Sequence, residues 1–356
     1  MTVLSRLLAQ GFEQLIAFQS TASGLRGFIA IHDTSRGPAI GGIRLWPYVG
    51  EEDALADALR LARAMSYKAS LAGLPCGGGK ATLVEHPGFD RKEGFADLGR
   101  LVENLGGRFY TGPDVGVTQA DLEQVGTATR HVARGPGLGH GDVGEHTALG
   151  VHHAVRACLS FTGPAASGRK LRAAVQGVGS VGMRLARLLH DDGMELTVAD
   201  TDASRARAAH DDLGARIVEP DAILDVDADV LAPCALGGVL SSESVGRLQA
   251  RIVCGSANDQ LADASVADRL VGRGVVYAPD YLVNAGGMIR GAEQHLLGRA
   301  DSLASVARIG ERTLGVLRTA RERGVSPARV ADELAEAGLG RDKPWSARFF
   351  GATGRS

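Results

Sequence analysis

Residues 171–200 read LRAAVQGVGSVGMRLARLLHDDGMELTVAD, and this stretch decides the fold of the chain around it. An apolar run leads directly into the glycine-rich turn 177–182, and apolar residues at helical spacing follow the turn. A second apolar run then ends in Asp200, about 20 residues after the first glycine, as in dinucleotide-binding proteins. A strand, a G-x-G-x-x-G turn, a helix and a second strand in this order predict a dinucleotide-binding α/β domain.

Each residue of this turn has an expected role. We expect Gly177 to make the turn, Gly179 to let the backbone approach a pyrophosphate, and Gly182 to let the helix pack closely on the strand. Ser180 and Val181 complete the predicted cofactor-binding turn. A glycine-rich turn that binds no nucleotide is the alternative.

Asp200 is expected to select the cofactor, because its carboxylate would accept hydrogen bonds from ribose hydroxyls and repel a 2′-phosphate. The sequence therefore predicts NAD rather than NADP. Further candidate strands at 228–232, 251–254 and 274–277 are each followed by a loop of small residues. Such loops line the ligand crevice of a doubly wound sheet. The cofactor-binding residues predicted in these loops are Cys234, Ala235, Leu236, Asn258 and Asn284.

The N-terminal half holds a second informative stretch, 67–80, which reads YKASLAGLPCGGGK. Lys68 and Lys80 bracket a mostly apolar segment, and Lys80 follows three glycines. Glycine lets a backbone approach a ligand and adopt positive φ, and a partly desolvated lysine has a lowered pKa that suits acid–base work. The pattern indicates a site for a small anion with a reacting carbonyl. A tight turn with solvated lysines is the alternative. A short strand is predicted over 81–84, directly after the glycines and Lys80.

Asp114 follows a strand predicted over 108–111 and stands in the sequence GPDVG. A carboxylate at a strand end is expected to point into a cleft, where it would act as a general base paired with a lysine. An aspartate bonded to its own backbone in a turn is the alternative. Upstream, 37–44 reads GPAIGGIR, and its glycine pair, Gly41 and Gly42, would expose backbone N–H groups to a ligand. A plain loop is the alternative.

The composition is that of a soluble globular protein, with 356 residues of which 44% are hydrophobic and 22% charged. A formal net charge of −2 argues against nucleic acid or an anionic membrane as the main partner, and no apolar run is long enough to span a bilayer. Four cysteines without a C-x-x-C pair indicate reduced thiols in a cytoplasmic protein. The histidines between 140 and 153 show no consistent ligand geometry, so no metal site is predicted.

The segment 134–144 holds five glycines and a proline and is the best candidate for a domain boundary. We predict a two-domain α/β protein with a cleft between the domains. An N-terminal α/β substrate-binding domain would cover 1–145, joined by a C-terminal helix at about 320–356, and a Rossmann-type doubly wound NAD-binding domain would cover 146–319. A short amphipathic N-terminal helix is predicted from Leu4, Leu7, Leu8, Phe12 and Leu15.

Taken together, the motifs resemble the glutamate/leucine/phenylalanine/valine dehydrogenase family, and within it the branch that acts on apolar amino acids. The resemblance runs from about 24 to 317. It rests on 37–44, 65–68 (MSYK), 77–80 (GGGK), 112–115 (GPDV), the turn at Gly177, 232–238 (APCALGG) and 277–287 (YAPDYLVNAGG).

The resemblance implies reversible oxidative deamination, in which an L-amino acid, NAD⁺ and water give a 2-oxo acid, ammonium and NADH. By the same resemblance Lys68 would bind the substrate carboxylate. Lys80, with a lowered pKa, would activate water and polarise the 2-oxo carbonyl, and Asp114 would move protons to and from nitrogen. Thr147 and Asn284 would lie near the nicotinamide. The family also suggests a homo-oligomer, at least a dimer.

Substrate handling is where this chain departs from the family. Relatives usually carry an asparagine where Asp259 stands, and that residue is expected to help hold the substrate carboxylate. The side-chain pocket implied by the resemblance comprises Ile40, Gly112, Met288 and Gly291, with Gly41 and Gly42 as walls. No charged residue in this set suits a glutamate side chain, and its glycines leave room, which favours a large apolar or aromatic substrate over valine.

Two other functions are considered. A 2-hydroxy-acid dehydrogenase would need a histidine–acid pair and a substrate arginine, whereas two lysines and an aspartate suit amine chemistry. A non-catalytic NAD-binding regulatory homologue is motivated by Asp259.

Overall fold

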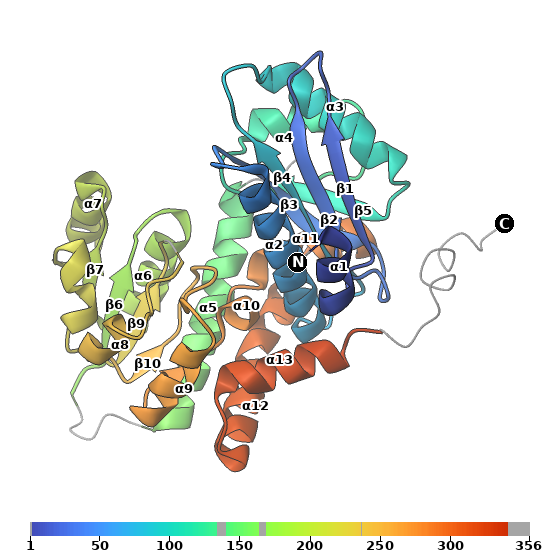
Figure 1. The fold of residues 1–356 in the computed structure, drawn as a ribbon. Helices are drawn as coiled ribbons and strands as arrows, with labels where there is room; N and C mark the ends of the chain where they lie inside the picture. The colour runs from blue at the N-terminus through green and yellow to red at the C-terminus, as the bar shows by residue number, and fades with distance from the viewer. Residues whose placement is uncertain (1, 134–139, 164–168, 236, 341–356) are drawn as a thin grey trace. The chain divides into compact units, whose positions relative to one another are not determined.

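The structure is a computed structural model that describes residues 2–133, 140–163, 169–235 and 237–340. The chain divides into two compact units, each with its own sheet (Figure 1). The first unit comprises Met1–His140, Gly291–Arg299 and Ala335–Ser356, and the second comprises Gly141–Arg290 and Ala300–Leu334.

The first unit is built on a five-stranded mixed sheet of order β1-β2-β4-β3-β5. Its strands are β1 (Gln14–Gln19), β2 (Arg26–Ile31), β3 (Ala39–Trp46), β4 (Gly77–Val84) and β5 (Phe109–Pro113). The pairs β1–β2 and β2–β4 are antiparallel, whereas β3 runs parallel to both β4 and β5. The sheet therefore delivers the carboxyl ends of three neighbouring parallel strands to one edge.

Helices cover both faces of this sheet. Helix α2 (Glu51–Leu71) begins with three acidic residues that suit the positive end of its dipole, and its apolar stripe, including Leu55 and Leu59, packs on Ala30 of β2. Helices α3 (Arg91–Asn104) and α4 (Gln119–Val125) cover the other face. Their fully buried Phe95 and Leu122 join one core with alternate residues of the strands.

Two parts of the first unit differ from the sequence analysis. The alternative of a plain loop at 37–44 does not hold, because most of this segment lies in β3, where Ala39, Ile43 and Leu45 alternate into the core. Helix α1 (Val3–Gln10) is real but ends at Gly11, which takes the left-handed conformation, so Phe12 and Leu15 lie beyond it. Both of these residues still pack against the core under α2, which explains their apolar character.

The second unit carries a six-stranded parallel sheet of order β11-β10-β9-β6-β7-β8. Counted from β6 the order is 3-2-1-4-5-6, which is the doubly wound dinucleotide-binding topology. The strands are β6 (Arg172–Gln176), β7 (Glu195–Ala199), β8 (Arg216–Ile217), β9 (Val230–Pro233), β10 (Ile252–Val253) and β11 (Val276–Tyr277). The fold class predicted from 171–200 is confirmed.

The helices of this unit follow the predicted alternation. They are α5 (His140–Thr162), α6 (Ser180–Asp191), α7 (Ala203–Leu213), the 3₁₀ helix η1 (Pro220–Asp225), α8 (Ser244–Arg247), α9 (Ser265–Gly272), α10 (Asp280–Val283), α12 (Leu303–Arg323) and α13 (Pro327–Ala337). Helix α11 (Gly286–Leu297) begins in the second unit and ends in the first. Helix α13 also begins in the second unit, and its last residues, from Ala335 on, belong to the first.

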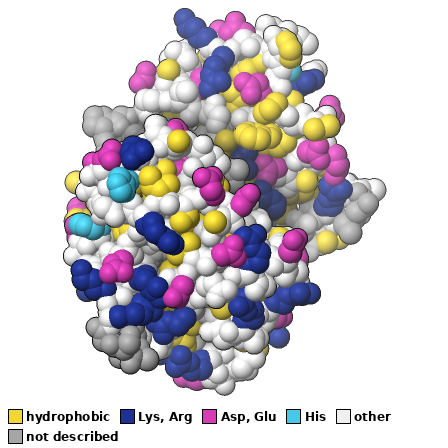
Figure 2. Space-filling model, turned by 90° about the vertical axis from the view of Figure 1, so that its left-hand side faces the viewer, with side chains coloured by type: hydrophobic (Ala, Val, Ile, Leu, Met, Phe, Trp, Pro, Cys, Tyr) yellow, Lys and Arg dark blue, Asp and Glu magenta, His cyan; other side chains and the backbone are white. Residues whose placement is uncertain are grey.

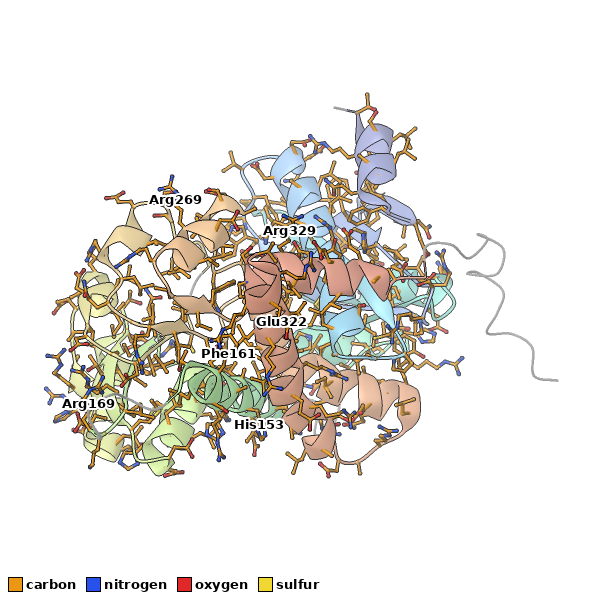
Figure 3. All side chains as sticks on the ribbon, turned by 90° about the horizontal axis from the view of Figure 1, so that it is seen from below. His153, Phe161, Arg169, Arg269, Glu322 and Arg329 are labelled. Carbon is orange, nitrogen blue, oxygen red and sulfur yellow. The ribbon has the colours of Figure 1, made fainter. Side chains whose placement is uncertain are left out.

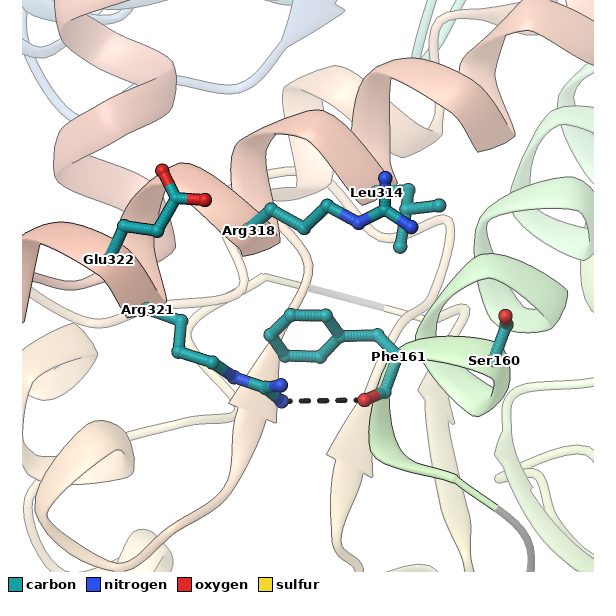
Figure 4. A pocket seen from close by; sticks show the side chains of 6 residues that line it. All are labelled: Ser160, Phe161, Leu314, Arg318, Arg321 and Glu322. Atoms are coloured by element: carbon teal, nitrogen blue, oxygen red, sulfur yellow. Dashed lines mark hydrogen bonds between the residues drawn. The ribbon is translucent and has the colours of Figure 1, made fainter.

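A pocket of about 390 Å³ lies between the end of α5 and α12 (Figure 4), and two of its lining residues, Phe161 and Glu322, are labelled in Figure 3. Arg321 donates a 3.3 Å hydrogen bond to the carbonyl of Phe161, and its guanidinium lies 3.6 Å from the centre of the phenylalanine ring (Figure 4). The arginine thus donates a hydrogen bond to a carbonyl in the last turn of α5, which has no partner within the helix, and so caps the end of α5.

Charged side chains of both signs are interspersed on the face shown in Figure 2, in keeping with a net charge of −2. No helix among the described residues is long and apolar enough to cross a membrane.

Candidate active site

Lys80 and Asp114 form an ion pair in the first unit. The Nζ atom of Lys80 lies 2.7 Å from Oδ2 of Asp114, and the two side chains are only 6% and 18% exposed. Lys80 lies between Gly78 and Thr82 on the face of β4 that meets α2, where Thr82 donates a hydrogen bond to the carbonyl of Ala54. The predicted pairing of the aspartate with a lysine is confirmed.

Arg44 binds the same carboxylate. The parallel register of β3 and β5 sets Ile43 beside Pro113, so the next residues, Arg44 and Asp114, are neighbours. Arg44 Nε lies 2.9 Å from Asp114 Oδ2. Burial alone would raise the pKa of Asp114, but the charges and hydrogen bonds of Lys80 and Arg44 outweigh burial and hold the pKa well below its ordinary value.

A second carboxylate holds the other end of Arg44. Its Nη1 atom lies 3.1 Å from Oδ2 of Asp57, and the hydroxyl of Tyr48 donates a 2.7 Å hydrogen bond to the same oxygen. Burial acts to raise the pKa of Asp57, but the Tyr48 hydrogen bond and the Arg44 charge lower it overall. Sequence reasoning assigned no role to these residues, although a strand arginine on the face shared with Ile40 and Gly42 is an indication of one.

The glycines before Lys80 lie in β4, so the alternative of a tight turn with solvated lysines does not hold. None of the three has positive φ. A Cβ atom on Gly78 would lie 2.1 Å from the backbone nitrogen of Ser66, and one on Gly79 would lie 2.9 Å from the ring of Phe109. These glycines let the strand pack on α2 and the core, rather than shape a turn.

Gly41 and Gly42 have the same character. A Cβ atom on Gly41 would lie 1.6 Å from the carbonyl oxygen of Gly79, and one on Gly42 would lie 2.9 Å from Cβ of Asp114. The absence of a side chain at Gly41 therefore allows the backbone of β4 to pack closely, and its absence at Gly42 leaves room for the side chain of Asp114.

The other predicted substrate residues are distributed over both units. Lys68 lies in the last turn of α2, on the side of the sheet that carries Lys80. A Cβ atom on Gly112 would meet only Cβ of Ala133, at 3.3 Å, and one on Gly291 would meet no atom within 4 Å. Met288 lies on α11 in the second unit.

The glycine turn of the second unit has the expected geometry. Gly177 has φ +86°, and a Cβ atom on Gly182 would lie 1.9 Å from the carbonyl oxygen of Gly177. Gly179 differs, because a Cβ atom there would meet only the end of Arg205, at 3.6 Å. The turn therefore leaves room over Gly179, directly before Ser180 and Val181 open α6, and this space fits a dinucleotide pyrophosphate.

Asp200 already supports this turn. Its Oδ2 atom accepts a 2.8 Å hydrogen bond from the backbone N–H of Val178, and Oδ1 accepts one of 2.9 Å from Asp202. The carboxylate at the end of β7 thus lies at the glycine turn, as an adenosine-ribose acceptor would.

Loops after the central strands converge beside the turn. The Cβ position of Gly177 is 2.8 Å from Cβ of Ala235, and that of Gly182 is 3.1 Å from Cβ of Cys234. Asn284 donates a 2.8 Å hydrogen bond to the side chain of Asn258. Leu236 lies outside the described residues.

Thr147 lies on α5 against the glycines that follow Asn284. Its backbone nitrogen would be 3.0 Å from a Cβ atom on Gly286, and its Oγ1 would be 2.9 Å from one on Gly287. These glycines therefore bring Thr147 and the Asn284 loop together within the second unit.

Asp259 has φ +52° and is the one non-glycine residue with positive φ in the described part of the chain. Its carbonyl accepts a 2.7 Å hydrogen bond from the N–H of Gly238. Asparagine and aspartate tolerate this conformation better than other residues do, so an aspartate in place of the family's asparagine preserves the loop.

Cys76 is fully buried, and burial raises the pKa of its thiol to about 12.

The Nε2 atom of His152 lies 2.7 Å from Oδ2 of Asp192. No group of three His, Cys, Asp or Glu side chains in the described ranges is arranged to hold a metal ion.

Comparisons with known proteins address both units. Residues 13–131 match the family described as "Glu/Leu/Phe/Val dehydrogenase, dimerisation domain", and residues 196–293 match "Glutamate/Leucine/Phenylalanine/Valine dehydrogenase". Leucine dehydrogenase of Thermoactinomyces intermedius is 41% identical over 332 residues, covering 91% of this chain and 90% of the relative. Valine dehydrogenase of Streptomyces albus is 41% identical over 333 residues, covering 92% of each chain.

A solved structure is similar over nearly the whole chain. The crystal structure of L-tryptophan dehydrogenase from Nostoc punctiforme has a TM-score of 0.82 and 35% sequence identity, and the match covers 96% of this chain and 100% of that one.

Proposed function

The chain belongs to the Glu/Leu/Phe/Val dehydrogenase family, and from that premise we propose the roles of its residues. It is an NAD-dependent L-amino-acid dehydrogenase that oxidatively deaminates apolar or aromatic amino acids to 2-oxo acids and ammonium. The observation that carries the proposed mechanism is the largely buried ion pair of Lys80 and Asp114.

NAD, held by the second unit, would supply the hydride acceptor for Cα, and water must then hydrolyse the imine of the oxidised substrate. Lys80 orients that water and stabilises the negative charge that develops on the attacking oxygen. Asp114, held as a carboxylate, takes the proton that the water loses and delivers it to the departing nitrogen. Lys68 fixes the substrate carboxylate, so that Cα stays in place through these steps.

The turn at Gly179 would hold the pyrophosphate of NAD, and Asp200 would accept the adenosine ribose hydroxyls. Asn284, held by Asn258, and Thr147 would support the nicotinamide end. We thus assign the substrate chiefly to the first unit and NAD to the second.

Space in the proposed side-chain pocket favours a bulky substrate. Gly112 and Gly291 present no side chain, and a Cβ atom on Gly291 would meet no atom within 4 Å. A pocket methyl group changes discrimination by about 1–3 kcal/mol, so several large apolar or aromatic amino acids would be accepted. We further propose that the chain forms a homo-oligomer, because the family model over 13–131 is described as a dimerisation domain.

One assay tests the proposal. NADH formation is followed with each of the twenty L-amino acids, and NADH consumption with the matching 2-oxo acids plus ammonium. Turnover that requires ammonium in the second direction is the expected result. The proposal would be refuted if NADH were consumed without ammonium, as in reduction of the 2-oxo acid to a 2-hydroxy acid. NAD binding without any turnover would also refute it. Lys80→Ala with near-normal turnover would refute the mechanism alone.

A further inference from the structure

Two cations bind one oxygen of Asp114 and leave the other open. Lys80 Nζ lies 2.7 Å and Arg44 Nε 2.9 Å from Oδ2. No residue that the structure describes donates a hydrogen bond to Oδ1. A carboxylate held in this way has a fixed orientation and one oxygen available to exchange a proton.

Arg44 is itself held at both ends. Its Nε atom binds Asp114, and its Nη1 atom lies 3.1 Å from Asp57, which also accepts the hydrogen bond of Tyr48. The side chains of Arg44 and Asp57 are 17% and 15% exposed, so solvent screens these contacts only partly. The planar guanidinium is therefore a rigid bracket between α2 and the end of β5.

Lys80 and Arg44 differ in their freedom. In the proposed mechanism Lys80 must turn towards the attacking water, so during turnover it cannot remain the anchor of Asp114. Arg44 is fixed by Asp57 and keeps its contact with Oδ2 throughout. Resting on the proposed function, we infer that Arg44 is a positioning residue that keeps Oδ2 of Asp114 anchored and presents Oδ1 to the substrate nitrogen and the attacking water.

Variants of Arg44 test this role through the pH profile. The charged groups around Asp114 are Lys80 from β4 and Arg44 from β3, with Asp57 of α2 and Tyr48 behind Arg44. Arg44→Gln removes a positive charge, so the acidic limb of kcat/KM should move to higher pH. We also expect kcat to fall at least tenfold, with KM for the amino acid changed less than threefold. Arg44→Lys should restore most of the limb but less of kcat.

A matched control uses another arginine of the same unit. Arg100 of α3 binds Glu93 with hydrogen bonds of 3.2 Å, and α3 covers the face of the sheet opposite to α2 and Lys80. Arg100→Gln should leave kcat and the pH profile unchanged. Asp57→Asn loosens Arg44 but removes a negative charge, so kcat should fall several-fold without a rise of the acidic limb.

The outcomes separate the inference from the proposed function. Arg44→Gln with an unchanged kcat and acidic limb would overturn the inference, while loss of turnover in Asp114→Asn would leave the proposed function standing. Normal turnover of Asp114→Asn would overturn the proton-transfer role of Asp114, and the inference with it, whereas only the absence of ammonium-dependent turnover in the wild type would overturn the proposed function. If the wild type shows no turnover, crystal structures of the wild type and Arg44→Gln decide, because an Asp114 carboxylate with unchanged orientation in the variant overturns the inference.

Discussion

Asp114 shows how a side chain's charge state is set by its neighbours rather than by burial alone. Burial favours the neutral acid, yet two cations on one oxygen keep the carboxylate ionised. Because the folded-state pKa lies below the unfolded value of about 3.9, the pair stabilises the fold above that pH, and the contribution is lost as the pH falls through the folded pKa.

This linkage predicts a pH-dependent difference between the wild type and Asp114→Asn. Their difference in unfolding free energy should stay constant from about pH 8 down to about pH 5 and shrink below about pH 4. Urea denaturation at a series of pH values measures it. The exposed Asp211→Asn serves as control, with little effect at any pH. A difference for Asp114→Asn that is independent of pH would contradict the prediction.

Substitutions of Asp259 separate the effect of its backbone conformation on stability from the effect of its charge on activity. With φ +52° the position accepts asparagine readily, whereas a β-branched residue is strained. Asp259→Asn should change stability by less than about 0.5 kcal/mol, and Asp259→Val should cost about 1–2 kcal/mol. If the charge opposes the substrate carboxylate, Asp259→Asn should also raise kcat/KM. Equal stability of the two variants would show that the conformation is not constrained.

At the scale of elements, β4 and α2 approach so closely that only glycine fits between them. Gly78→Ala would place Cβ 2.1 Å from Ser66 N, and backbone cannot move as a side chain can. We expect a loss of about 1–3 kcal/mol, with lower turnover, because Lys80 lies two residues along the same face. Gly315→Ala on α12 is the control: its Cβ meets no atom within 4 Å, and it should stabilise by about 0.5–1 kcal/mol. Thermal unfolding of both variants measures the contrast.

The elements also show what sequence reasoning could and could not supply. The dinucleotide-binding half was predictable because its apolar periods and glycine turn are local signals. Strand β3 was missed because its glycines have poor strand propensity and are held there by neighbouring strands. The pairing of Lys80 with Asp114 follows from charge, whereas the place of Arg44 depends on the register of parallel strands far apart in sequence.

At the scale of the whole molecule, helix α1 presents an apolar face to solvent. Leu4 and Leu8, one helical turn apart, are 78% and 86% exposed, whereas Leu7 packs inwards against the core under α2. Strand β1 lies at the edge of its sheet and, among the described residues, pairs only with β2. An apolar helix face and an open strand edge in one unit are features that a second copy of the chain would cover.

We therefore predict that a double variant, Leu4→Ser with Leu8→Ser, reduces the mass of the assembly in solution, because it removes apolar area that association buries. Light scattering coupled to size exclusion, over a range of protein concentrations, measures that mass. Val271→Ser, at an exposed apolar residue of α9 in the other unit, should leave it unchanged. A wild type that stays monomeric would refute the homo-oligomer, whereas a double variant with the wild-type mass would place the contact elsewhere than α1.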